Sequence, residues 1–421
     1  MPSRARVKSL SIFVLLALAA GLVAGALIKN AAPQLTDAAD IATAFGGLWL
    51  NALRMTVVPL VVSLLITGIA SVADTAKTGG LVLRAVLLFT ALLFFAATYS
   101  VIVTNGWLAL WPLDRAAADA FIAGVGDSAV IITEPPSFAS WLQGLAPYNP
   151  VKAAAEDGML ALVVFSIFFG FAVTRLEPAM RDQIVGFFRA VSEAMIVIVH
   201  WVLLAGPFGV FALALGVGLH AGLGAAGTLA QYVIIVTGVT AGSTLIAWLI
   251  AITFGGQPAG RFTAAATPVW AIAASTQSSL ASLPAMLEAA LRGLKLPPSV
   301  ADVVLPLAVA VFRFTSPVAN LAVCFFVAHL YGLEPSLIQI VSAVVVAYAV
   351  SIAAVGLPGQ ISFIASIAPI CLALGVPTEV LGILIAVEVI PDIWRTLGNV
   401  TGDLAATSIL SRGRRDEETP P

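Results

Sequence analysis

The chain has 421 residues, of which 60% are hydrophobic and 10% are charged, and its formal net charge is −2. Soluble domains carry about a quarter of their residues as charged side chains, so this composition excludes an ordinary water-soluble fold and indicates a protein dissolved in lipid. The net charge says little about partners in a membrane protein, but no part of the chain is basic enough to suggest a nucleic-acid partner. Cys324 and Cys371 lie in apolar segments, where buried, inert thiols are expected rather than a disulfide or a metal site.

Long apolar stretches predict membrane-spanning helices in the first part of the chain. Residues 10–28 are uncharged and long enough to cross about 30 Å of hydrocarbon as a helix. The stretch follows three basic residues, but its length and the later spans favour a retained helix over a signal peptide. Further spans are expected at residues 42–72, 79–110, 158–175, 185–218 and 227–254. The segments 42–72, 79–110 and 185–218 exceed about 20 residues, so tilt or extra-membrane turns are expected in them. Arg54, inside the second span, is expected to reach toward the lipid headgroups.

The basic residues predict the orientation of these spans. With the N-terminus inside, fourteen of the 20 Lys and Arg residues fall on the inner side. Lys29, Arg115 and Lys152 fall on the outer side, and the remaining three lie within spans. The positive-inside rule therefore predicts cytoplasmic N- and C-termini in the cell membrane.

Beyond residue 255 the apolar stretches become shorter and are interrupted by polar residues, Gly and Pro. Two breaks, STQSSLASLP (275–284) and AAVGLPGQ (353–360), are too irregular for continuous spans and predict re-entrant helical hairpins. Each is followed by a span that carries an arginine, Arg313 or Arg395. Hairpin and span thus occur twice, entering once from each side, which predicts an inverted repeat with a polar site between the two breaks.

The last span carries a stripe of polar residues. At helical spacing, Glu388, Asp392, Arg395, Asn399 and Asp403 project within an arc of about 80°, with Thr396 at its edge. Ionisable groups inside a membrane face a cavity or a partner. Arg395 presents a planar fork suited to a carboxylate, and Asp392 is placed to face an ammonium group. This pair predicts a site for an acidic amino acid.

The motif DIWRTLGNVTGD (392–403) resembles the last-span motif of the glutamate transporter homologues, the dicarboxylate/amino acid:cation symporters. Further stretches match in order, among them LRMTVVPLVVSLLITGIASV (53–72), PYNPVKAAAEDGML (147–160), GPFGVFALA (206–214) and VGLPG (355–359). The resemblance implies an all-α fold of eight transmembrane helices and two re-entrant hairpins. It also implies a homotrimer in which a transport domain (79–112 and 227–411) moves like an elevator against a scaffold (8–75 and 152–222), with an outer loop (113–151) and a cytoplasmic tail (412–421).

The resemblance also implies the substrate contacts. Asp392 would hold the amino group of the substrate, and Arg395 its side-chain carboxylate. The remaining pocket residues implied in this way are Thr396, Asn399, Ser278, Ser279, Ser316 and the backbone around Leu357 and Gly359.

Two departures from the family pattern bear on the coupling ion. Where relatives carry an Asn-Met-Asp-Gly-Thr sequence that binds sodium, this chain has Phe312-Arg313-Phe314-Thr315-Ser316, which lacks those oxygen ligands. Gln277 replaces an arginine found in archaeal members. We therefore expect no sodium site and no other cofactor or metal. Arg313 is expected to pair with Asp403 or another carboxylate of the stripe. Glu388 is the first candidate to carry a coupled proton, because burial disfavours the charged carboxylate.

The sequence predicts a symporter for aspartate or glutamate, proton-coupled or sodium-independent, whose partners are a small acidic solute and the bilayer. A C4-dicarboxylate carrier is an alternative, although Asp392 would repel such a substrate. A membrane sensor or channel-like protein on the same scaffold is another. An enzyme is not expected, because no nucleophile–base pair or nucleotide loop is present.

Overall fold

The computed structural model of the chain describes residues 4–76, 80–125, 138–222, 224–353 and 359–412, and all regular structure in these ranges is helical. The helices of the first half are α1 (Arg4–Ala31), η1 (Pro33–Leu35), α2 (Thr36–Arg54), α3 (Val57–Ala76), α4 (Gly80–Leu110), α5 (Arg115–Val125), α6 (Phe138–Gly144), α7 (Pro150–Ala155), α8 (Met159–Val173), α9 (Pro178–Leu204) and α10 (Gly206–Ala221). The second half contains α11 (Gly224–Thr253), α12 (Ala259–Thr276), α13 (Ser279–Glu288), the π-helical turn η2 (Ala289–Gly293), α14 (Pro298–Val311), α15 (Ser316–Leu330), α16 (Leu337–Ala353), α17 (Gly359–Leu374), α18 (Leu381–Val387) and α19 (Val389–Leu410).

Several of these helices match the predicted spans. Within the described ranges, six helical stretches are long and apolar enough to cross a membrane, and the shorter α8, α10, α16 and part of α17 are also apolar. Large apolar side chains such as Phe45, Leu87 and Phe208 are exposed on the surface. Such an apolar surface is unfavourable in water but is the surface expected of a protein surrounded by lipid. The chain is therefore a multi-pass helical membrane protein.

Two predicted spans are interrupted in the structure. Residues 42–72 form α2 and α3, which are separated at Met55 and Thr56, where the Thr56 hydroxyl donates to the Leu53 carbonyl (2.8 Å). Residues 185–218, an overlong segment in which tilt or a turn was expected, form two helices rather than one: α9 ends at Leu204 and α10 begins at Gly206. A proline at position 207 explains this break, because it removes a backbone donor and favours a helix start.

The expectation for Arg54 was wrong. Its guanidinium Nη2 lies 2.7 Å from Oε1 of Glu379 and contacts the Thr378 hydroxyl. Both acceptors lie in the connection between α17 and α18. An intramolecular carboxylate therefore takes the place that we had assigned to lipid headgroups.

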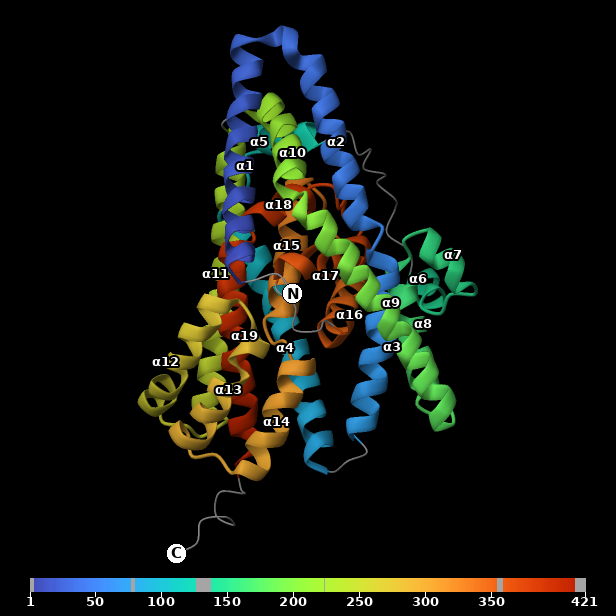
Figure 1. Cartoon of the computed structure of the whole chain (residues 1–421), viewed down its shortest axis with the longest axis vertical. Helices are drawn as coiled ribbons and strands as arrows, with labels where there is room; N and C mark the ends of the chain where they lie inside the picture. Colours follow the sequence, from blue (N-terminus) through green and yellow to red (C-terminus); the bar gives the residue numbers. More distant parts are fainter. Residues whose placement is uncertain (1–3, 77–79, 126–137, 223, 354–358, 413–421) are drawn as a thin grey trace, which may run out of the picture.

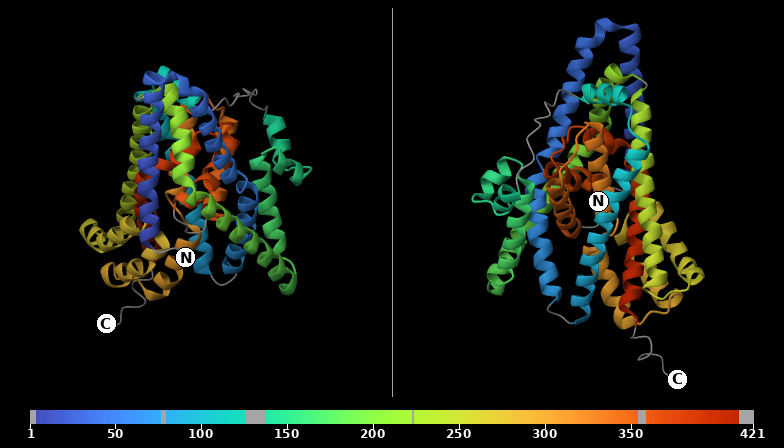
Figure 2. Two further views of the ribbon diagram at one scale, coloured as in Figure 1. Left: turned by 45° about the horizontal axis from the view of Figure 1, so that its top comes forward. Right: turned by 180° about the vertical axis from the view of Figure 1, so that it is seen from behind.

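Helices distant in sequence lie side by side in two groups (Figures 1 and 2). α10 packs against α1, α2 and α5, whereas α19 packs against α11, α12 and α14. The α1–α2 turn and the α12–α14 region lie at opposite ends of the molecule (Figure 1). The grouping places the polar face of α19 between α11 and the α14–α15 junction. The boundaries of the two predicted domains remain a prediction.

The first polar break is a helix–turn–helix in the structure. α12 ends at Thr276, Gln277 adopts a left-handed conformation (φ 50°), and Ser278 caps α13 by accepting a hydrogen bond from the Ala281 amide (3.3 Å). α12 and α13 pack against each other, as do α16 and α17, which precede and follow the second break. The tip of the second break, including Leu357, lies outside the described residues, while Gly359 begins α17.

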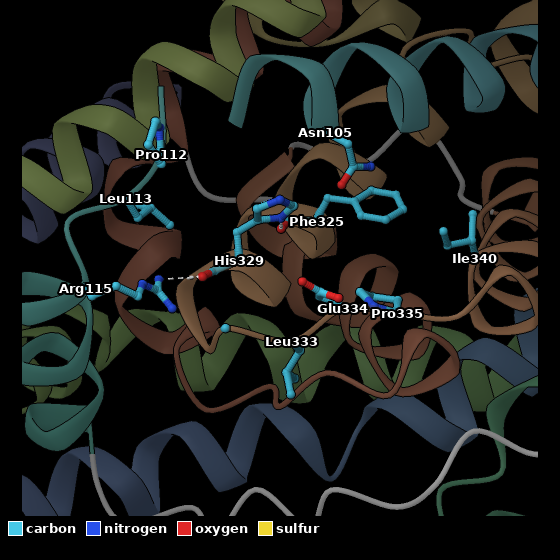
Figure 3. A pocket seen from close by; sticks show the side chains of 11 residues that line it. Asn105, Pro112, Leu113, Arg115, Phe325, His329, Leu333, Glu334, Pro335 and Ile340 are labelled. Atoms are coloured by element: carbon cyan, nitrogen blue, oxygen red, sulfur yellow. Dashed lines mark hydrogen bonds between the residues drawn. The ribbon is translucent and has the colours of Figure 1, made fainter. Parts of the chain in front are cut away.

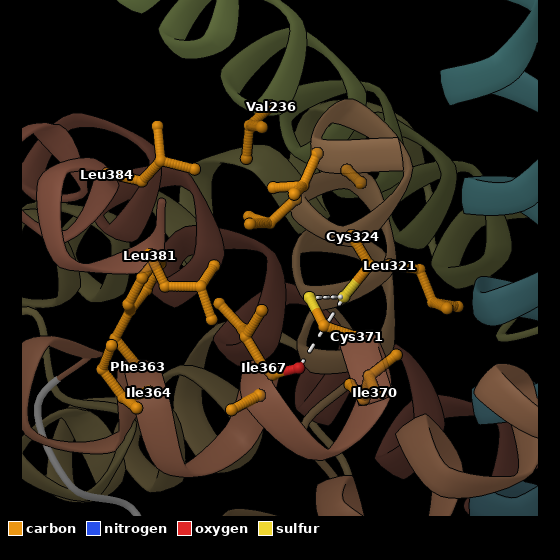
Figure 4. Close-up of a cluster of buried hydrophobic side chains, with 14 of the residues drawn as sticks. Val236, Leu321, Cys324, Phe363, Ile364, Ile367, Ile370, Cys371, Leu381 and Leu384 are labelled. Carbon is orange, nitrogen blue, oxygen red and sulfur yellow. Dashed lines mark hydrogen bonds between the residues drawn. The ribbon is translucent and has the colours of Figure 1, made fainter. Parts of the chain in front are cut away.

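The core between α15 and α17 contains both cysteines (Figure 4). Cys324 and Cys371 are fully buried free thiols, and their sulfur atoms lie 3.2 Å apart. Leu321, Ile367 and other apolar side chains surround them. The prediction of buried thiols is confirmed, and their contact lies where α17 packs against α15.

Candidate substrate site

The polar stripe of α19 faces the protein interior. Glu388, Asp392, Arg395, Asn399 and Asp403 are each at most 3% exposed, whereas Ile390 and Trp394 on the opposite face are 46% and 37% exposed. The helical periodicity thus predicted the buried face correctly. Since buried charges are costly unless they are paired, the partners of each group determine what this face can do.

Arg395 is held by an internal carboxylate. Its Nη2 donates to Oε1 of Glu388, which lies immediately before α19. Its Nε lies 3.9 Å from Oδ1 of Asp392 and has no hydrogen-bond partner among the described residues. The guanidinium therefore carries an unused donor in addition to the group that binds Glu388.

Tyr232 of α11 completes this ion pair. Its hydroxyl donates to Oε2 of Glu388 (2.8 Å), so both oxygens of the carboxylate are bound. Tyr232 is fully buried and packs edge-on against Phe326. Glu388 lies at the junction of α18 and α19, which lets its side chain turn back toward Arg395 two turns along. The three residues form a chain from α11 to the centre of α19.

Asn399 joins α19 to the junction of α14 and α15. Its Oδ1 accepts from the backbone amide of Thr315 (2.9 Å) and lies 2.8 Å from the Thr315 hydroxyl. The same hydroxyl lies 2.6 Å from the Arg395 carbonyl oxygen. These contacts fix the amide oxygen of Asn399, so its N–H groups are the donors that it offers a ligand.

A face of glycines allows this close approach. A Cβ atom on Gly398 would lie 2.3 Å from Thr315, and one on Gly402 would lie 2.8 Å from the Cβ of Phe314. Gly398 and Gly402 are four residues apart, the spacing that lets membrane helices pack closely. The motif therefore positions the α14–α15 junction against the polar stripe.

The other end of the stripe contains aromatic rings. Phe312 and Phe314 are each 1% exposed, and Phe312 stacks on Phe89 of α4 with ring centroids 4.5 Å apart. The residues that replace the family's sodium ligands thus fill space with hydrocarbon. Sodium requires several oxygen ligands, as hard cations do, and these two side chains supply none.

Arg313 and Asp403 are both buried near these rings. Arg313 interacts electrostatically with Arg395, Asp392 and Asp403. No carboxylate of the described residues lies within 4.0 Å of its guanidinium nitrogens. Both oxygens of Asp403 are buried without a hydrogen-bond partner there. The expected direct pairing of Arg313 with Asp403 is therefore not formed in this structure, although the two charges remain close enough to interact.

The first helix break and the α14–α15 junction both lie beside α19. Gln277 donates from its side-chain nitrogen to the Val389 carbonyl (3.1 Å), which places Ser278 and the buried Ser279 beside the first turn of α19. Ser316, at the start of α15, accepts a hydrogen bond from Asn320 (3.4 Å). Thr396 bonds back to the Asp392 carbonyl (3.0 Å). Ser278 and Ser279 thus lie beside the first turn of α19, and Ser316 lies next to the Thr315–Asn399 contact. Which of these residues bind the substrate stays a prediction.

Sequence reasoning missed Tyr232 and Thr315 as members of this site. Tyr232 lies in the apolar span at 227–254, next to Gln231. A phenol within a span needs a hydrogen-bond partner, and this requirement could have been used to find it. Thr315 stood in the altered sodium motif, but its contact with Asn399 depends on the packing of Gly398, which the sequence alone does not reveal.

Comparison with known proteins gives relatives along almost the whole chain. A proton/glutamate-aspartate symporter of Escherichia coli (strain K12) is 26% identical over 369 residues, 87% of this chain and 84% of that protein. A proton/sodium-glutamate symport protein of Bacillus subtilis (strain 168) is 28% identical, covering 87% and 85% of the two chains. The human neutral amino acid transporter B(0) is also 28% identical, covering 96% and 80%.

The match extends to the level of the family. The model of the sodium:dicarboxylate symporter family matches residues 10–412, which include every described residue of the polar stripe. Members of this family are transporters rather than enzymes, in agreement with the absence of a predicted catalytic group. This chain therefore belongs to the sodium:dicarboxylate symporter family.

Proposed function

We propose that this protein is a symporter for an acidic amino acid, aspartate or glutamate. The buried pair of Arg395 and Glu388 is the observation that carries the proposal. It supplies a desolvated guanidinium that already binds a carboxylate. Asp392 lies beside it to receive an ammonium group. The names of the bacterial relatives, which are symporters of glutamate or of glutamate and aspartate, support the same substrate class.

Binding exchanges one carboxylate for another. In the empty carrier Glu388 occupies Arg395, so the side-chain carboxylate of the substrate must take its place. The free Nε–H of Arg395 and the N–H groups of Asn399 supply further donors. A bidentate guanidinium–carboxylate pair is among the stronger hydrogen-bonded contacts. It therefore provides the affinity that displacing Glu388 requires.

The displaced Glu388 explains how a proton can accompany the substrate. Once Arg395 turns to the substrate, only the Tyr232 hydroxyl remains bound to a fully buried carboxylate. A buried charge without a countercharge is strongly unfavourable, so Glu388 takes up a proton. Release of the substrate returns Arg395 to Glu388 and expels that proton. Phe312 and Phe314 support a sodium-independent cycle, because they replace oxygen ligands.

Uptake by proteoliposomes tests both substrate and coupling. Labelled aspartate is offered under a proton gradient alone, under a sodium gradient alone, and under neither. We expect accumulation under the proton gradient and no response to sodium. Uptake that requires sodium and ignores the proton gradient would contradict the coupling. Absence of any aspartate uptake, or competition by succinate equal to that by aspartate, would contradict the substrate.

A neutral amino acid is a second candidate, and the same ion pair favours it. If Glu388 stayed on Arg395, the guanidinium would be neutralised and the pocket would accept a side chain without charge. The relative that transports neutral amino acids is consistent with this arrangement. Competition of aspartate uptake by serine or alanine separates the two candidates. Stronger inhibition by the neutral amino acids would favour the second.

We further propose the elevator arrangement of the family, with eight spans, two re-entrant hairpins, cytoplasmic termini and a homotrimer. The packing of α10 with α1, α2 and α5, apart from α19 with α11 and α12, supports two groups of helices that can move against each other. Cross-linking a cysteine introduced at position 54 to one at position 379 should trap the carrier and stop uptake. Continued uptake in the cross-linked protein would contradict this movement.

A further inference from the structure

A cavity lies away from the α19 stripe. It has a volume of about 450 Å³ and is bounded by the ends of α4 and α15, the start of α5 and the connection to α16 (Figure 3). Its polar lining is Asn105, Arg115, His329 and Glu334, and its apolar lining includes Leu113 and Phe325. The volume is in the range of small-molecule sites, about 300–1,000 Å³. We call it the α5–α15 pocket.

The wall of the pocket formed by the end of α15 is preformed. Leu333 donates to the Ala328 carbonyl (2.8 Å) and Gly332 to the His329 carbonyl (3.1 Å), with Gly332 at φ +66°. This is the Schellman arrangement that closes helix ends. Arg115 binds the His329 and Leu330 carbonyls through Nη2 (2.6 and 3.3 Å). Ligand binding would therefore not have to order this wall.

Three acceptors of the pocket remain unused by the described residues. The side-chain nitrogen of Asn105 donates to the Val101 carbonyl (2.7 Å), so the side-chain oxygen remains as an acceptor for a ligand. His329 donates from Nδ1 to the Phe325 carbonyl (2.9 Å), so Nε2 is left as an acceptor in the neutral ring. Glu334 is exposed, with no hydrogen bond or ion pair to another described residue. Together these acceptors favour a ligand rich in N–H groups, such as an ammonium.

Arg115 adds an opposite charge to the same pocket. In Figure 3, Arg115 lies on one side of His329, whereas Asn105 and Glu334 lie on the other. A simple cation would be attracted by Glu334 but repelled by Arg115, and a simple anion would meet the reverse. A ligand with both charges satisfies each end. The Nη1 of Arg115, which lies over Gly332, is not used by the helix-end carbonyls.

We propose that the α5–α15 pocket binds a zwitterion that carries an ammonium group near Glu334, His329 and Asn105 and an anionic group near Arg115. Two sources offer this chemistry, a free amino acid and the phosphoethanolamine headgroup of a lipid. The pocket shares no residue with the proposed substrate site, so it goes beyond the proposed function and can fail without it.

Calorimetric titration of the purified full-length chain tests the pocket. The probes are aspartate and glycerophosphoethanolamine as zwitterions, succinate as an anion and ethylamine as a cation. Arg395→Ala removes the substrate site and isolates the pocket. Because this variant leaves Glu388 uncompensated, glycerophosphoethanolamine is also titrated into the unmodified chain. We expect binding of a zwitterion at least about tenfold tighter than of succinate or ethylamine, each of which carries charge of one sign only.

Glu334→Gln keeps the shape of the side chain and removes its charge. We expect it to weaken binding of the zwitterion by about tenfold or more, whereas Glu288→Gln, an exposed site on another helix, leaves binding unchanged. Equal affinity of Glu334→Gln and the unmodified chain, or no preference for zwitterions, would overturn the proposal. Both results are independent of aspartate uptake, which tests the proposed function separately.

The two sources are then distinguished with the same protein. Binding of aspartate without glycerophosphoethanolamine assigns the pocket to a solute. Binding of glycerophosphoethanolamine, together with stronger thermal stabilisation by vesicles of phosphatidylethanolamine than of phosphatidylglycerol, assigns it to a lipid headgroup. If the pocket binds a lipid headgroup, Glu334→Gln must also lose the thermal stabilisation by phosphatidylethanolamine vesicles.

Discussion

The two ends of the buried face of α19 differ in how a buried carboxylate is stabilised. At the first end, both oxygens of Glu388 are bound, one by Arg395 and one by Tyr232. At the other end, Asp403 is equally buried, but both of its oxygens lack a hydrogen-bond partner among the described residues. Arg313 provides a positive charge nearby without a direct contact. We call the first end saturated, because both carboxylate oxygens of Glu388 have a hydrogen-bond partner, and the second end unsaturated, because those of Asp403 have none among the described residues.

This difference indicates separate roles for the two ends. A carboxylate that saturates an arginine imitates a bound substrate and must be displaced when the substrate arrives. A carboxylate compensated only at a distance contributes to the local charge but has no contact to exchange. We therefore propose that substrate and proton meet at the first end, and that the buried cation Arg313 takes the place of a sodium ion at the second.

The largest effect should come from breaking the saturated end. Arg395→Ala removes the partner of a buried carboxylate and the group that binds the substrate. Breaking a buried ion pair costs about 3–5 kcal/mol, so we expect lower thermal stability and loss of aspartate binding by more than about 100-fold. Thermal unfolding and binding of labelled aspartate measure the two effects.

Arg395→Lys is the matched control, since it keeps the charge but loses the planar fork. It should recover stability more than binding. If Arg395→Ala retained aspartate affinity, the paired end of α19 would not be the substrate site.

Glu388→Gln tests whether the internal carboxylate carries the proton. The amide resembles the protonated acid, so Arg395 stays available at every pH. In the unmodified chain, uptake of one proton with each substrate should weaken aspartate binding by about tenfold per pH unit on the alkaline side. In Glu388→Gln the affinity should be high and independent of pH, and a proton gradient should no longer drive accumulation. A variant that kept the pH dependence would assign the proton to another group.

The helical stripe, the first helix break and the family could be predicted from the sequence because each depends on local pattern. Burial of five residues follows from a spacing of three or four residues along one helix. The partners of these residues could not be predicted in this way. Glu388, Asp392 and Asp403 share one helix face with Arg395. Which of these carboxylates Arg395 contacts depends on side-chain geometry.

The breaks in spans 42–72 and 185–218 show a related limit. Hydropathy alone joined segments that Thr56 and Pro207 interrupt, since both segments remain apolar across the break. Arg54 was assigned to lipid for the same reason, because Glu379 is distant in sequence and its approach arises from packing of α2 beside α17. Local pattern predicts which residues face inward, whereas tertiary packing decides which of them meet.

Tyr232→Phe sharpens the comparison by removing one of the two contacts of Glu388. The hydroxyl donates to the carboxylate at 2.8 Å and so favours its charged form. A hydrogen bond to a charged group contributes about 1.5–3 kcal/mol, so the pH profile of aspartate uptake should move by about one unit to higher pH. Maximal uptake should change little. Tyr99→Phe is the control. It removes a hydroxyl of α4 that donates to the Val239 carbonyl of α11, the helix of Tyr232, and it should leave the pH profile unchanged.

The smallest effect on transport is expected at the unsaturated end. Asp403→Asn leaves the guanidinium of Arg313 with less opposite charge, and Arg313→Met leaves Asp403 with none, so each single variant should lower stability. The double variant removes both charges, and replacing a buried pair by neutral groups is often neutral or stabilising. It should bind aspartate within about threefold of the unmodified chain, a change of less than about 0.6 kcal/mol, and keep proton-driven uptake.

Thermal unfolding and uptake of the four proteins form a double-mutant cycle, in which a coupling of about 0.5–3 kcal/mol is expected for interacting residues. If the double variant instead lost proton-driven uptake as Glu388→Gln does, Asp403 would take part in coupling and the two ends of α19 would not have separate roles.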